Sequence, residues 1–164
     1  KIEIQLINLI NFYKKKETFT DEDLKNFIDK NKEQLDIEYI DFTYAIINPK
    51  NLIGSDDFNQ AFFDKIDEIE VKISNNLDNK NLLKDYQIEP VKVSNFRNSG
   101  NKKDVENKIF ESKNIDYDII EFGDNFILYK INDVNVKSPD LEDNELKKEL
   151  IDLLYQKNIF EYNR

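Results

Sequence analysis

Apolar residues near the N-terminus recur every three or four positions, the spacing of one face of an α-helix. This face consists of Ile2, Leu6, Leu9, Ile10 and Tyr13. A second helix is predicted after Thr20, because Thr followed three positions later by the carboxylate of Asp23 resembles a capping box. Its apolar positions are Leu24, Phe27, Ile28 and Leu35. The chain is therefore expected to begin with two amphipathic helices, at residues 2–13 and after Thr20, joined by a short polar connector.

The central pattern changes from helix to strand and back. Residues 37–48 carry β-branched and aromatic side chains at both odd and even positions, which is typical of a strand covered on both faces. Ser55 is the predicted cap of a long helix over about residues 56–75. The core-facing stripe of that helix is Phe58, Phe62, Ile66, Ile69 and Ile73. A shorter helix is predicted over residues 79–86.

The last third of the chain predicts three more strands and two helices. The strands are expected near residues 90–95, 117–122 and 126–136, the last two joined by a turn at Gly123-Asp124-Asn125. A loop over 97–103 leads to a small helix marked by Val105, Ile109 and Phe110. The last helix is expected to start at Ser138-Pro139 and to cover residues 141–160, with its apolar face at Leu146, Leu150, Leu153 and Leu154.

These elements predict an α+β fold with a four-stranded antiparallel sheet. We divide the chain into an N-terminal helical part (1–36), a central sheet domain (37–137) and a C-terminal helix (138–164). The C-terminal helix is expected to pack with the N-terminal helices, because each has an apolar stripe too wide for an isolated helix in water.

Composition excludes several classes of function. The 164 residues have a net charge of −10, which disfavours binding to nucleic acid or to anionic lipid. Cys and His are absent, so zinc sites, Ser-His and Cys-His nucleophile systems and redox chemistry are not expected. No segment approaches the roughly 20 apolar residues of a membrane helix, and we expect no membrane insertion by this part of the protein.

Clustered carboxylates raise the question of a cation site. The clusters are Asp56-Asp57, Asp67-Glu68-Glu70 and Asp140-Glu142-Asp143-Glu145. None includes the loop with a central Gly that calcium-binding hands require, and all fall at helix starts or on helix faces. Capping and solvation explain them better, because the helix dipole favours acidic first turns. We expect no metal and no cofactor.

The order of the elements resembles a known family. FTDEDLKNFIDKNKEQLDIEYIDFTYAII, EFGDNFILYKINDV and SPDLEDNELKKELIDLL look like three consecutive parts of SurA/PpiD-type periplasmic chaperones. The middle of the chain resembles their parvulin (PpiC-type) peptidyl-prolyl isomerase domain, a four-stranded antiparallel sheet packed by helices. The flanking helices resemble their helical chaperone region. The resemblance covers residues 20 to 160 and rests on order and pattern.

The departures from this family concern its catalytic residues. Parvulins carry one His on the first strand and another on the last, where this chain has Ala45 and Ile127, give or take one residue. The family's Gly-Gly-Asp-Leu-Gly stretch has no counterpart. Isomerisation must lower a barrier of about 18–20 kcal/mol, and Ala and Ile offer an apolar surface without the polar groups that frame such a pocket. The resemblance therefore implies a degenerate isomerase.

The implied function is binding of unfolded or newly exported polypeptides in the periplasm. Candidate peptide-binding residues are the aromatics Tyr44, Phe63, Phe96 and Phe126, and Tyr13, Tyr155 and Tyr162 on the terminal helices offer further contacts. Two alternatives stay open. One is an active but divergent isomerase, and the other is an architectural, partner-docking segment of a protein held at the inner membrane by an anchor outside this sequence. The sequence does not decide the oligomeric state.

Overall fold

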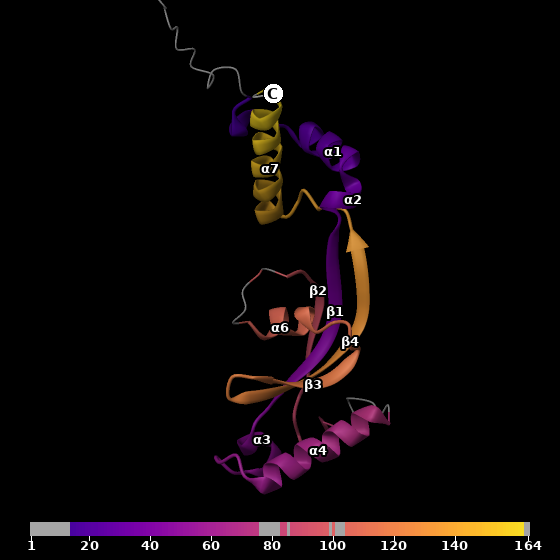
Figure 1. Ribbon diagram of the computed structural model, residues 1–164, viewed down its shortest axis with the longest axis vertical. Coiled ribbons are helices and arrows are strands. Elements are labelled where there is room, and N and C mark those ends of the chain that lie inside the picture. Colours follow the sequence, from indigo (N-terminus) through magenta and orange to yellow (C-terminus); the bar gives the residue numbers. More distant parts are fainter. Residues whose placement is uncertain (1–13, 76–82, 85, 99, 101–103, 163–164) are drawn as a thin grey trace, which may run out of the picture. The chain divides into compact units, whose positions relative to one another are not determined.

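The computed structural model describes residues 14–75, 83–84, 86–98, 100 and 104–162 (Figure 1). The chain divides into two compact units. Unit 1 consists of Lys1–Ile37 together with Lys137–Arg164, and unit 2 of Glu38–Val136. The helix predicted over residues 2–13 lies outside the described residues, as does most of the one predicted over 79–86.

A four-stranded antiparallel sheet forms the centre of unit 2, which confirms the predicted α+β class. Its strands are β1 (Ile37–Ile47), β2 (Val91–Phe96), β3 (Tyr117–Phe122) and β4 (Asn125–Lys137), in the order β2-β1-β4-β3. The two long strands, β1 and β4, therefore run side by side in the middle (Figure 1). At one end of this pair the Asn48 amide lies 3.4 Å from the Asn125 side-chain oxygen.

Both faces of β1 contribute side chains to cores, as its sequence predicted, although Ile46 near its end is 41% exposed. Side chains at even positions, such as Phe42, join one core, and side chains at odd positions, such as Ile47, join another. Helix α6 (Val105–Glu111) covers the even face through Ile109. Helix α4 (Gln60–Ser74) covers the odd face with Phe62, Ile66 and Ile69. We call these the α6 face and the α4 face.

A β-bulge separates the two ends of the β1–β2 pair. Ile40 pairs with Phe96 and Phe42 with Val93, so β2 holds one residue more than β1 between these pairs. Asn95 absorbs the extra residue with a φ of 52°, a left-handed conformation that Asn tolerates better than most residues. Its backbone N–H donates to the Asp41 carboxylate at 2.7 Å. The bulge keeps Phe96 packed against the α6 face.

The connection after β1 differs from the prediction in two respects. A short helix, α3 (Pro49–Ile53), follows the strand, with Asn48 as its cap and Gly54 in the left-handed conformation after it. Helix α4 then begins at Gln60, because Asn59 and not Ser55 accepts the hydrogen bond from the Phe62 N–H, at 3.1 Å. The Ser55 hydroxyl instead accepts from the Asp57 N–H and shapes the preceding turn.

Unit 1 contains η2 (Lys16–Thr18), α1 (Asp21–Lys30), α2 (Lys32–Leu35) and α7 (Asn144–Tyr162). Leu24 and Ile28 of α1 pack against Leu146 and Leu150 of α7 in a small core. The predicted capping box is confirmed: the Thr20 hydroxyl accepts from the Asp23 N–H, and the Asp23 carboxylate accepts from the Thr20 N–H.

Two helix limits in unit 1 differ from the expectation. The helix after Thr20 does not run unbroken to Leu35, because the Asn31 side chain donates to the Phe27 carbonyl at 2.7 Å and ends α1. The last helix begins at Asn144 and not at Ser138-Pro139. The Asp143 carboxylate accepts from the N–H groups of Glu145 and Leu146 at 2.9 and 3.1 Å, which caps α7 there.

We expect Leu150→Ala to lower the free energy of unfolding by about 2–5 kcal/mol, because it opens a cavity in the small core of unit 1. Leu153→Ala is the matched control on the same helix. Leu153 is 51% exposed, so its loss should change stability by no more than about 0.5 kcal/mol. Urea unfolding followed by circular dichroism measures both, and equal effects would contradict the assigned core.

Candidate functional site

The positions expected for the parvulin histidines are closed. Ala45 and Ile127 are buried, and they lie on opposite faces of the sheet, Ala45 on the α4 face and Ile127 on the α6 face. A shift of one residue pairs Tyr44 with Ile127, or Ala45 with Leu128, and each of these residues is buried as well. The remaining shifts reach Phe126, which is half-buried against the α4 face, or Ile46, which is 41% exposed. Two side chains that frame one pocket must lie on the same face of the sheet. Ala45 and Ile127 lie on opposite faces and therefore cannot frame one pocket.

Tyr44 and Phe96 lie on the α6 face and mainly fill its core. The Tyr44 hydroxyl donates to the Glu106 carboxylate at 2.9 Å, and burial together with this bond raises the pKa of Tyr44 to about 12. Phe42 links the pair, with ring centroids 5.9 Å from Tyr44 and 5.8 Å from Phe96. Burial and the nearby charge of Asp118 raise the pKa of Tyr129 to about 12. A general acid or base needs a pKa near the working pH, which neither tyrosine has.

Phe63 and Phe126 lie on the α4 side and form a separate aromatic patch. Both rings contact buried Phe62, at centroid distances of 5.4 and 5.5 Å. Phe63 and neighbouring Phe58 remain 42% and 45% exposed. The four aromatic candidates are therefore divided between two faces of the sheet and do not form one peptide-binding surface. The exposed members, Phe58 and Phe63, gather before and within the first turn of α4.

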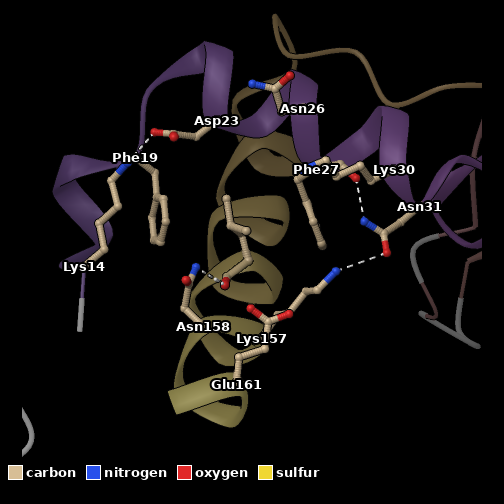
Figure 2. Close-up of a pocket in the computed structure, with 11 residues that line it drawn as sticks. Lys14, Phe19, Asp23, Asn26, Phe27, Lys30, Asn31, Lys157, Asn158 and Glu161 are labelled. Carbon is tan, nitrogen blue, oxygen red and sulfur yellow. Dashed lines mark hydrogen bonds and ion pairs between the residues drawn. The ribbon is translucent and has the colours of Figure 1, made fainter. Parts of the chain in front are cut away.

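A groove of about 560 Å³ lies between α1 and α7 in unit 1 (Figure 2). Phe19, Phe27 and Leu154 are its apolar wall. Figure 2 shows both phenylalanine rings pointing from the α1 side toward α7. The remaining lining residues are polar or charged: Lys14, Asp23, Asn26, Lys30, Asn31, Lys157, Asn158 and Glu161. This volume is within the range of about 300–1,000 Å³ that is usual for ligand pockets.

One end of the groove is built around Asp23. Its carboxylate accepts from the Lys14 ammonium at 2.6 Å and from the Thr20 N–H at 2.8 Å. These bonds, with the Lys14 bond first, lower the pKa of Asp23 from 3.8 to about 2. The same ammonium lies 5.1 Å from the centroid of the Phe19 ring. Lys14 is thus held over an aromatic face by the residue that caps α1.

The other end repeats this arrangement with residues from both helices. The Lys157 ammonium lies 5.3 Å from the centroid of the Phe27 ring and 3.3 Å from the Asn31 side-chain oxygen (Figure 2). Asn31 in turn caps α1 through the Phe27 carbonyl. A lysine on an aromatic ring gains about 0.5–1 kcal/mol at an exposed site, so each lysine is held only weakly over its ring.

The groove is suited to binding rather than to catalysis. Its aromatic rings can contact apolar side chains, and its amides and ammonium groups can hydrogen-bond to carbonyl and carboxylate oxygens. In the part of the chain that the structure describes, no three carboxylates come together in a way that could hold a metal ion. A short stretch of extended polypeptide offers both kinds of contact that this lining can satisfy.

Sequence reasoning did not find this groove. The sequence pattern places Phe27 on the apolar face of a helix and gives Phe19 no role. The contact between Lys157 and Phe27 arises only from tertiary packing, so no local pattern indicates it. Of the terminal tyrosines, Tyr155 lies beneath the Lys16 ammonium, 5.3 Å from it, and does not line the groove. Tyr162 is exposed, and Tyr13 lies outside the described residues.

No family model, curated protein sequence or solved structure matches the chain. Among the described helices, none is long and apolar enough to cross a membrane.

Asp23→Asn should destabilise the protein at neutral pH and lose this effect in acid. Asp23 has a folded-state pKa of about 2 against an ordinary 3.8, so its charge stabilises the fold above about pH 4. That contribution disappears as the pH falls through about 2. Thermal melts of the unaltered protein and of Asp23→Asn from pH 7 to 2 measure the difference in melting temperature at each pH. Asp29→Asn on the same helix is the control, and a difference that is independent of pH would contradict the assignment.

Proposed function

We propose that this chain is a polypeptide-binding domain of the SurA/PpiD chaperone type, with a parvulin-type unit that does not isomerise proline. Its clients are unfolded or newly exported polypeptides, and its compartment is the periplasm. The observation that carries the proposal is the groove between α1 and α7, whose lining combines two aromatic rings with amides and lysines.

The order of elements in unit 2 supports the parvulin-type assignment. A long strand, helices, a strand, a small helix and a closing hairpin follow one another as β1, α3, α4, β2, α6, β3 and β4. This order resembles that of a parvulin domain. Unit 1, whose helices come from both ends of the chain, corresponds to the flanking chaperone helices of that family.

The filled sheet faces support the absence of isomerase activity. Holding a twisted proline imide requires an open apolar pocket with polar groups beside it. The side chains at the expected histidine positions are instead buried within packed cores, and the tyrosine beside one of them, Tyr44, is engaged with Glu106. The divergent-isomerase alternative has no comparable observation in its favour.

We expect the protein not to accelerate proline isomerisation. Uncatalysed X-Pro exchange takes tens to hundreds of seconds, so a protease-coupled assay on a proline peptide can detect tenfold acceleration, which needs only about 1.4 kcal/mol of barrier lowering. The rate should equal that of the peptide alone at micromolar protein. Acceleration that survives repurification and scales with protein concentration would overturn this expectation.

Phe19→Ser should weaken binding of a labelled, unfolded test polypeptide by about fivefold to tenfold, roughly 1–1.4 kcal/mol, because it removes one aromatic wall of the groove. Fluorescence anisotropy measures the affinity, and slowing of the test protein's aggregation gives a second readout. Phe63→Ser is the matched control, since it removes an exposed phenylalanine from the aromatic patch of unit 2.

The pair of variants also distinguishes the candidate surfaces. Loss of binding in Phe63→Ser alone would move the site to the patch beside α4. If the unaltered protein neither binds the polypeptide nor slows its aggregation, the chaperone proposal fails and the architectural alternative is favoured.

A further inference from the structure

Two lysines in the groove have no carboxylate partner in the described part of the chain. Lys157 donates to the neutral oxygen of Asn31, and Lys30 lines the same groove without an ion pair. An ammonium group has three donors, so Lys157 retains donors for a ligand. These lysines contrast with Lys16 and Lys147, which are paired with Asp152 and Asp21 at 2.6 Å.

The carboxylates of the groove do not cancel this positive charge. Asp23 is engaged by Lys14 and by the Thr20 N–H, so its charge is compensated locally. Glu161 is the other carboxylate of the lining. With the Lys14–Asp23 pair set aside, Lys30 and Lys157 oppose Glu161 alone. The groove is therefore locally cationic on a protein whose net charge is −10.

We propose that the groove selects polypeptide segments in which a carboxylate lies next to apolar side chains. The apolar side chains contact Phe19 and Phe27, while Lys157 and Lys30 bind the carboxylate. This inference rests on the proposed polypeptide-binding function and adds the class of segment that is preferred. Carboxylates are the anions of an unmodified polypeptide, and the acidic remainder of the surface would repel them.

The charge balance predicts opposite changes in affinity for a carboxylate when the lysines or Glu161 of the groove are neutralised. Replacing Lys157 or Lys30 by Gln removes attraction for the carboxylate, whereas replacing Glu161 by Gln removes repulsion. Lys157→Arg retains the charge and its place over the Phe27 ring. Exposed ion pairs contribute about 0.2–1 kcal/mol, which corresponds to a change of at most about fivefold in affinity for each lysine.

The test uses two labelled peptides with blocked ends, identical except for a central Glu or Gln between apolar residues. Anisotropy titrations of the full chain give the ratio of the two affinities. We expect the Glu peptide to bind about threefold to fivefold more tightly at low salt, and the ratio to fall as salt screens the charges. Lys157→Gln with Lys30→Gln should bring the ratio to about one, Glu161→Gln should raise it, and Lys157→Arg should preserve it.

The outcomes distinguish failure of the carboxylate preference from failure of the proposed function. Equal binding of both peptides by the unaltered protein, or tighter binding of the Gln peptide, overturns the carboxylate preference and leaves polypeptide binding in place. A preference that survives Lys157→Gln with Lys30→Gln also overturns it, because the lysines then do not cause it. Failure of both peptides to bind would overturn the inference and the proposed function together.

Discussion

The antiparallel pairing of β1 with β4 is the constraint on which the rest of the structure depends. The Thr43 and Asn132 side chains, 3.0 Å apart, mark the middle of this pair. Because the strands run in opposite directions, the start of β1 lies beside the end of β4. Asp36 and Ser138 consequently meet at 2.9 Å, although 102 positions separate them in sequence. Unit 1 can therefore be assembled from both ends of the chain, with α1 and α7 as neighbours.

The two units use their apolar residues differently. In unit 2, β1 and β4 contribute side chains to cores on both faces of the sheet, and the buried hydroxyls of Tyr44 and Tyr129 find acceptors in Glu106 and the Ser112 carbonyl. A face packed in this way has no space for a substrate. In unit 1 the core is smaller, and the rings of Phe19 and Phe27 line a groove beside it. The packed faces of unit 2 and the open groove of unit 1 are the structural basis of the proposed binding role.

The same polar side chains cap α1 and arrange the groove. The Asp23 carboxylate accepts a hydrogen bond from the Thr20 N–H at the start of α1 and holds Lys14 over Phe19. Asn31 satisfies a carbonyl at the end of the helix and accepts a hydrogen bond from Lys157, which lies over Phe27. Helix ends leave backbone groups without intrahelical partners, so caps occur there for reasons of stability. Here the caps also determine which lysines are compensated and which are available to a ligand.

Local patterns determined most of the secondary structure. β-branched and aromatic runs and a turn signal located the strands, helical spacing located α4 and α7, and the Thr20–Asp23 box located the start of α1, because each signal acts within a few residues. Local residues also account for α3, which Asn48 caps, Pro49 begins and the left-handed Gly54 ends. Only the structure shows that Asn59 and Asp143 are the caps, through hydrogen bonds from the backbone N–H groups that follow them. The groove depended on tertiary structure throughout, since Phe27 and Lys157 lie 130 positions apart and no local pattern indicates that α1 and α7 place them together.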